Sequence, residues 1–211
     1  MVPERTTLCN LTYKMINQFD LLIDSFLDNK IGIDIGFLNK TLALGLQQNI
    51  LQLQQNDKMT GAGIGNADLK DVHQKMRSDK IYWMDKGHDN KFEKEFLQLV
   101  EDFITYLNST CYTGINGYEF HYAVYEEGSF YKRHKDQFKN DSNRKYSLIS
   151  YLNNNWLEED GGQLLVYQNE TVQNILPHSQ TAVFFKSDEM EHEVTEAHRP
   201  RMSITRWLKC M

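Results

Sequence analysis

The change in the spacing of apolar residues near residue 119 restricts the fold of this chain more than any other feature. In several segments before residue 108, apolar side chains recur every three or four positions, as they do in amphipathic helices. After residue 119 they form short runs separated by turn residues, which is typical of β-strands. These runs are residues 119–125, 129–135, 146–152, 163–167, 171–176, 181–186, 192–195 and 201–208. Eight short strands predict a closed or two-sheet barrel of the jelly-roll class.

Amphipathic segments precede the predicted barrel, and each carries an apolar stripe that suits packing against a sheet. They cover residues 14–29, 37–53 and 92–107. A chain of 211 residues is long enough for one well-packed domain. We therefore expect a single domain over residues 1–211, with an α+β fold that is mainly β. In this fold a helical support in residues 1–110 packs outside a jelly-roll core at residues 118–208.

Residues 58–78 lack the periodicity of the segments around them. Gly61, Gly63 and Gly65 lie close together there, which indicates a mobile loop. The glycine spacing does not fit a dinucleotide-binding fingerprint. Because long loops are often functional and this one directly precedes a predicted strand at residues 80–84, we interpret it as a lid.

Charge and composition narrow the classes of function. A net charge of −6 gives no basic surface for nucleic acid, and no apolar run approaches the roughly 20 residues that span a bilayer. The first residues lack the pattern of a secretory signal. The cysteines are odd in number and widely spaced (Cys9, Cys111 and Cys210), which favours reduced thiols over disulfide bonds. We therefore expect a cytoplasmic protein with no membrane or nucleic-acid partner.

His134 and Asp136 are the most informative polar pair in the predicted barrel. Residues two positions apart on a strand point to the same face, so this histidine and this aspartate can bind one metal ion together. His192 lies on a different predicted strand and can supply a third ligand. Two histidines and one carboxylate form the facial triad that holds Fe(II) in non-haem oxygenases.

Arg201 begins the last predicted strand, nine positions after His192. A buried arginine needs an anion, and the planar guanidinium suits a carboxylate that binds through both oxygens. Tyr125, Tyr131 and Tyr151 lie on strands of the same barrel, and their hydroxyls need partners if they face its interior. A bound carboxylate would be the anion for the arginine and would accept hydrogen bonds from the tyrosine hydroxyls.

Each of these residues also has a purely structural interpretation. A single His-x-Asp pair is common by chance, and His134 and His192 could be partly buried histidines that bond to nearby carboxylates. Arg201 could form an internal ion pair, and the three tyrosines could belong to an aromatic core.

The motifs taken together resemble a known family. The segment Arg77–Trp83 is similar to an Arg-Gly-Asp-Lys/Arg-Ile-x-Trp motif, with Ser78 in place of the glycine. Further motifs are Tyr125-x5-Tyr131-x2-His134-x-Asp136, Tyr151-Leu152-Asn153, Gly161-Gly162-Gln163-Leu164, His192-Glu193-Val194 and Arg201 to Trp207. The chain thereby resembles the Fe(II)- and 2-oxoglutarate-dependent oxygenases, and among them the prolyl 4-hydroxylases of the hypoxia-inducible-factor type and their bacterial relatives.

The resemblance implies a double-stranded β-helix and a role for each matching residue. His134, Asp136 and His192 would bind Fe(II), and Arg201 with Tyr151 would hold the distal carboxylate of 2-oxoglutarate. Other residues would line the site, namely Tyr125, Leu164, Trp207, Tyr131 and His121. O₂ is the second co-substrate, and ascorbate is implied as a reductant.

The expected reaction is hydroxylation of a prolyl residue in a protein or peptide, with release of succinate and CO₂. Residues 58–78 would grip this substrate, since they occupy the place of the mobile loop in the family. A hydroxylase of a free amino acid or small metabolite is the alternative within the class. A cupin-like barrel that binds a ligand or metal without turnover is the alternative outside it.

Overall fold

The computed structural model describes residues 18–62, 76–137 and 143–211 of the chain. A first helix runs through residues 18–29 of this part. The elements that follow are β1 (Ile31–Asp34), α2 (Lys40–Gln55), β2 (Thr60–Gly61), β3 (Lys80–Trp83), α4 (Lys91–Thr110), β4 (Gly117–Tyr125), β5 (Tyr131–His134), β6 (Arg144–Tyr151), a short 3₁₀ helix (Glu158–Asp160), β7 (Leu164–Gln168), β8 (Thr171–Ile175), β9 (Ala182–Lys186), β10 (Glu191–Val194) and β11 (Arg201–Lys209). Each predicted helix and strand has a counterpart among them.

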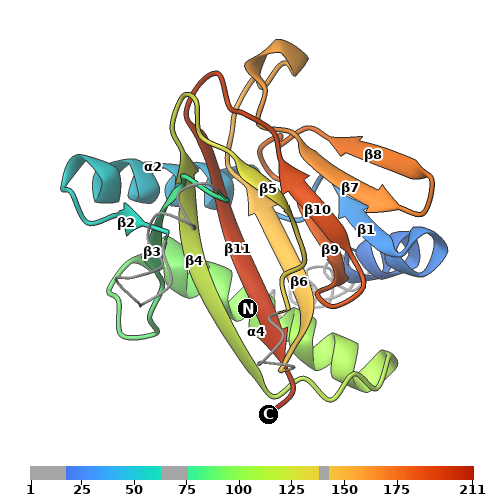
Figure 1. Ribbon diagram of the computed structural model, residues 1–211. Helices are drawn as coiled ribbons and strands as arrows, with labels where there is room; N and C mark the ends of the chain where they lie inside the picture. The colour runs from blue at the N-terminus through green and yellow to red at the C-terminus, as the bar shows by residue number, and fades with distance from the viewer. Residues whose placement is uncertain (1–17, 63–75, 138–142) are drawn as a thin grey trace.

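The strands form two antiparallel sheets that face each other (Figure 1). The larger sheet has seven strands in the order β1-β9-β6-β11-β4-β3-β2, and the smaller has four in the order β5-β10-β7-β8. β11 lies at the centre of the larger sheet, where it pairs with β4 on one side and with β6 on the other. This arrangement is the predicted jelly-roll core.

Helices cover the outer face of the seven-stranded sheet, as the sequence predicts (Figure 1). One hydrophobic cluster joins the helices to that face, with Leu46 of α2 and Phe103 of α4 packing in the same cluster as Phe184 and Ile204 of the sheet. A second cluster fills the space between the sheets. Alternation along each strand therefore divides its side chains between a helix-facing core and a barrel interior. None of the described helices has the length and hydropathy needed to cross a membrane.

Strand β1 is an addition to the predicted elements. It pairs with β9 at one edge of the larger sheet. Its Gly32 lies directly against the first helix, and a Cβ atom there would come within 2.4 Å of the Leu22 carbonyl oxygen. A strand of four residues that includes a glycine and a polar Asp34 gives too weak a pattern to be found from the sequence.

The predicted loop at residues 58–78 is described only at its two ends. Its first part contains β2, which pairs with β3 through Thr60 and Ile81. Its last part places Arg77 in a bridge with Tyr131. Residues 63–75 lie outside the described part of the chain, so the interpretation of the loop as a lid stays a prediction.

Strand β11 buries an arginine on each of its two faces, whereas the sequence suggests only one. Arg201 points between the sheets, and Arg206 points to the helices, where its guanidinium carbon lies 3.9 Å from the centre of the Phe96 ring and 4.7 Å from that of Phe120. None of its three side-chain nitrogens has a hydrogen-bond partner within the described residues. Burial holds the pKa of Arg206 well below its usual value.

We expect Arg206→Met to raise the free energy of unfolding by about 1–3 kcal/mol, because methionine fills a similar volume without burying a charge. Urea denaturation followed by circular dichroism would measure the change. A loss of stability would contradict the prediction and would show that the guanidinium is paired in the folded protein.

Candidate active site

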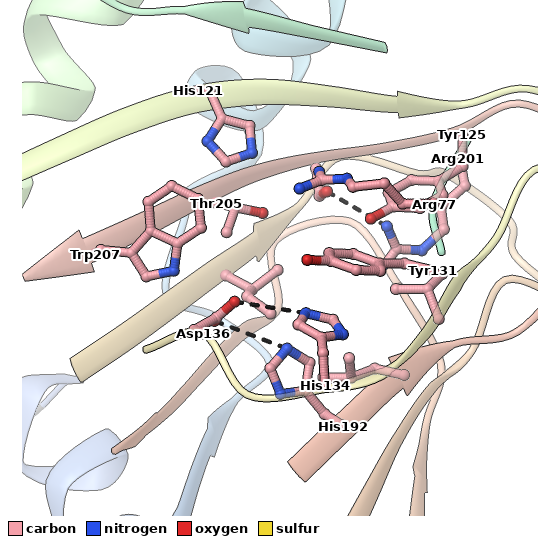
Figure 2. Close-up of a pocket in the computed structure, with 14 residues that line it drawn as sticks. Arg77, His121, Tyr125, Tyr131, His134, Asp136, His192, Arg201, Thr205 and Trp207 are labelled. Carbon is pink, nitrogen blue, oxygen red and sulfur yellow. Dashed lines mark hydrogen bonds and ion pairs between the residues drawn. The ribbon is translucent and has the colours of Figure 1, made fainter. Parts of the chain in front are cut away.

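A pocket lies between the two sheets, and the predicted site residues gather around it (Figure 2). The larger sheet contributes His121 and Tyr125 from β4 and the inward side chains of β11. The smaller sheet contributes residues of β5, β7 and β10.

His134, Asp136 and His192 converge at one end of this pocket (Figure 2). His134 ends β5 and is the direct cross-strand partner of His192 on β10, so the pairing of the two strands brings the two rings together. Asp136 lies two residues beyond the first histidine. Its Oδ1 is 3.6 Å from His134 Nε2, and its Oδ2 is 3.7 Å from His192 Nε2. One ligand atom from each residue lies within 4.8 Å of the others, a spacing that fits one metal ion.

Hydrogen bonds to the main chain orient both imidazoles. His134 Nδ1 lies 2.7 Å from the Lys132 carbonyl oxygen, and His192 Nδ1 lies 3.2 Å from that of Met190. An N–H at Nδ1 donates to each carbonyl, which leaves the lone pair of Nε2 directed at Asp136. This tautomer is the one that a metal ligand requires.

The charge states of His192 and Asp136 also suit a divalent cation. Burial lowers the pKa of His192 to about 4, so its ring is neutral at neutral pH. Burial acts to raise the pKa of Asp136, but the two histidines and a hydrogen bond from Ser147 outweigh it and hold the pKa well below its usual range. Neutral imidazole with an ionised carboxylate is the donor set that Fe(II) takes in facial triads.

Ser147 fixes the carboxylate and is a residue that the sequence analysis missed. Its hydroxyl donates to Asp136 Oδ2 at 2.6 Å, and its Oγ lies 2.9 Å from that of Ser187. Both serines are fully buried. Serine is so common in sequences that only the folded barrel reveals this contact.

Arg201 lies deeper in the barrel and is almost fully buried. Its Nε donates to the Gly162 carbonyl oxygen at 2.7 Å, and its guanidinium carbon lies 4.8 Å from the centre of the Tyr125 ring and 5.1 Å from that of Tyr151. Gly162 has a φ of 63°, and a Cβ there would come within 2.9 Å of the Arg201 side chain. The glycine therefore allows the close approach that holds the arginine in place.

The surroundings of Arg201 suit a small carboxylate. Among residues 18–62, 76–137 and 143–211, no aspartate or glutamate forms an ion pair with it. The hydroxyl of Tyr151 is buried beside it and has no hydrogen-bond partner in the same residues. A carboxylate ligand would accept hydrogen bonds from both groups, so the donors present fit the distal end of 2-oxoglutarate.

The remaining predicted residues also lie at the pocket, with one exception. Tyr125, Tyr131, Leu164, Trp207 and His121 form part of its wall, whereas Tyr151 lies next to Arg201 and is not among the residues that line the pocket. The ring of Tyr131 stacks on that of His134 with centroids 3.5 Å apart. Further lining residues that the sequence analysis did not assign are Arg77, Ile149, Val194, Ser203 and Thr205.

Strand periodicity could have found two of the missed residues. Ser203 and Thr205 alternate with Arg201 and Trp207 on the inward face of β11, so all four point the same way. Strand alternation does not identify Arg77, because this residue precedes β3 and only the folded chain brings it to the pocket wall. Its guanidinium lies 4.2 Å from the centre of the Tyr131 ring and makes two hydrogen bonds with the Asp79 carboxylate, at 2.7 and 2.6 Å.

Comparisons with known proteins agree with this geometry. Residues 120–209 match the model of the 2OG-Fe(II) oxygenase superfamily. A Pseudomonas putida prolyl-4-hydroxylase superposes with a TM-score of 0.83 at 27% identity, covering 92% of this chain and 99% of that one. A Trichoplax adhaerens prolyl hydroxylase, solved with a peptide fragment of the hypoxia-inducible-factor oxygen degradation domain, gives 0.83 at 25% identity, with 99% and 94% covered.

The fold, the triad geometry and these matches support a 2-oxoglutarate-dependent dioxygenase, a class of enzyme that uses Fe(II), 2-oxoglutarate and O₂. Within this class it resembles the prolyl 4-hydroxylases. The family resemblance and three of the inferred cofactors, Fe(II), 2-oxoglutarate and O₂, are thereby confirmed. The role of ascorbate stays a prediction.

Proposed function

We propose that this enzyme hydroxylates a prolyl residue of a protein or peptide and releases succinate and CO₂. The observation that carries the proposal is the likeness to two prolyl hydroxylases over nearly the full length of all three chains. The Trichoplax relative was solved with a peptide, which favours a polypeptide substrate over a free amino acid.

In this proposal His134, Asp136 and His192 bind Fe(II), while Arg201 and the Tyr151 hydroxyl bind the distal carboxylate of 2-oxoglutarate. Iron with its co-substrate and O₂ supplies the oxidant for a C–H bond when all are bound. The protein holds these reagents in place. Tyr131 packs on one imidazole, and the Gly162 carbonyl oxygen orients the arginine.

Other residues separate this chemistry from water. Tyr125, Leu164 and Trp207 are each less than a tenth exposed, although they line the pocket. Apolar walls around an ionised site exclude solvent and limit side reactions. We assign these three residues, with Tyr131, to binding the co-substrate and the reacting residue.

We further propose that residues 1–211 form one domain and that residues 58–78 grip the substrate. A hydrophobic cluster that α2 and α4 share with the larger sheet supports the first statement. The contact of Arg77 with Tyr131 supports the second, because it fixes the described end of the loop at the pocket.

Anaerobic addition of Fe(II) and 2-oxoglutarate tests the proposal first, since a visible charge-transfer band reports that both bind. Air is then admitted with a panel of proline-containing peptides and free amino acids, while succinate and oxygen incorporation are measured. Succinate with a hydroxylated peptide supports the proposal. Turnover of free amino acids alone would favour the metabolite hydroxylase, and tight metal binding without succinate would favour a cupin-like binding protein.

Ser147→Ala should weaken iron binding about 10- to 100-fold, because Asp136 loses the hydrogen bond that fixes its carboxylate. Titration of the anaerobic protein with Fe(II) at saturating 2-oxoglutarate, followed by the charge-transfer band, would measure the change. Ser147→Thr keeps the hydroxyl and is the control. Equal affinities in the alanine variant and the wild type would show that Asp136 is held by other contacts.

A further inference from the structure

His121 is a polar residue in the pocket wall, and its ring packs between two tryptophans. Its ring centre lies 5.0 Å from that of Trp83 and 5.1 Å from that of Trp207. Cross-strand pairing explains this position, because β4 places His121 opposite Trp83 of β3 and opposite Thr205 of β11. Figure 2 shows the imidazole pointing from β4 into the space that Arg77 and Tyr131 also face.

One nitrogen of the buried imidazole lacks a hydrogen-bond partner in the part of the chain that the structure describes. His121 is 2% exposed, and its Nδ1 has no partner within the described residues. The indole N–H of Trp207, against which it packs, is also without one there. A buried polar group without a partner is costly, and phenylalanine or methionine would fill the same space without that cost. Two such groups on one wall of a pocket indicate that a ligand supplies the partners.

The charge state of His121 narrows the chemistry of this ligand. Burial, and after it the nearby Arg77, lower the pKa of His121 to about 4. Asp79 and Asp136 oppose this shift, and Arg144 adds a smaller lowering effect. The ring is therefore neutral at neutral pH, with one N–H donor and one acceptor nitrogen. A neutral donor and acceptor between two aromatic rings suits an uncharged amide better than an ammonium or carboxylate group.

We infer that His121 binds a main-chain amide of the substrate next to the reacting residue and thereby favours peptides over free amino acids. This inference rests on the proposed function and adds a specificity-determining residue to it. The amide is the uncharged group that every peptide substrate presents and a free amino acid lacks. Trp83 is 48% exposed, so the aromatic group formed by Trp83, His121 and Trp207 extends from the pocket to the surface, where a polypeptide can reach it.

The test compares His121→Met with His121→Gln on a peptide that the wild type hydroxylates. Methionine keeps the apolar packing and removes both hydrogen-bonding atoms, so KM for the peptide should rise about tenfold. Glutamine retains a neutral donor and acceptor and should restore most of the affinity. The same two substitutions at His178, which is exposed and outside the pocket wall, are the control.

A second measurement separates substrate contact from a structural role. The same peptide is prepared with an ester in place of the amide that follows the reacting proline, and separately in place of the amide that precedes the residue before the proline. The amide between that residue and the proline is kept, because its nitrogen belongs to the proline ring. One of the esters should cost the wild type about tenfold in kcat/KM and cost His121→Met little, because the partner is already absent. Equal ester penalties in wild type and variant would overturn the inference, as would an unchanged peptide KM in His121→Met.

Failure of the proposed function gives a different result. In that case the wild type hydroxylates no proline-containing peptide, whatever residue stands at position 121. If it hydroxylates a free amino acid instead, the role of His121 in binding an amide is overturned as well. The charge-transfer titration with 2-oxoglutarate shows in each variant whether the co-substrate site has formed.

Discussion

Asp136→Ala is expected to abolish iron-dependent succinate formation while leaving the fold intact. The substitution removes the carboxylate from the proposed ligand set and leaves the two histidines without an anionic partner. A site of two neutral imidazoles has no charge to offset that of Fe(II) and one position fewer to hold it. The affinity for iron should therefore fall together with turnover.

The measurements are an anaerobic Fe(II) titration, a succinate assay and a circular dichroism spectrum of the same preparation. Asp188→Ala is the matched control, because Asp188 is exposed and lies on the chain near the site without lining the pocket. The control should bind iron and form succinate as the wild type does. Wild-type turnover in Asp136→Ala would mean that the three residues do not form the metal site.

Arg201→Ala is expected to raise KM for 2-oxoglutarate about 100-fold or more. The wild-type guanidinium is buried and oriented by the Gly162 carbonyl oxygen, and a charged hydrogen bond of this kind contributes about 1.5–3 kcal/mol. Alanine removes at least two such bonds to a carboxylate. Arg201→Lys keeps the charge without the planar fork and should fall between wild type and alanine.

Arg206→Met is the control for Arg201, since Arg206 lies on the same strand with its side chain on the opposite face. It should leave KM for 2-oxoglutarate unchanged. Tyr151→Phe should raise this KM about tenfold through loss of one neutral hydrogen bond. An unchanged KM in Arg201→Ala would show that the co-substrate binds elsewhere in the pocket.

The barrel and part of the candidate site could be predicted from the sequence, because both depend on the spacing of residues that are close together in the chain. Short apolar runs between turns identify antiparallel strands, and β4 to β11 lie close to the predicted ranges. Arg201 starts an alternating strand, so a two-residue period places it on the inner face. Asp136 lies just beyond the end of β5, and its separation from His134 by one residue keeps the two side chains close together.

The features that the sequence could not supply depend on contacts between distant parts of the chain. Ser147 reaches Asp136 only because β6 lies behind the metal site. Arg206 is buried against Phe96 of α4 and Phe120 of β4, and nothing in the residues around it in sequence predicts this burial. The missing hydrogen-bond partner of His121 is likewise a property of the folded pocket.

The two halves of the proposed site belong to different sheets. His134 and His192 lie on β5 and β10 of the smaller sheet, whereas Tyr151 and Arg201 lie on β6 and β11 of the larger one. A co-substrate that contacts both sets therefore bridges the two sheets, and its affinity depends on the distance between the sheets. Substitutions that widen or narrow this gap can tune the enzyme's demand for 2-oxoglutarate without altering a single residue that touches it.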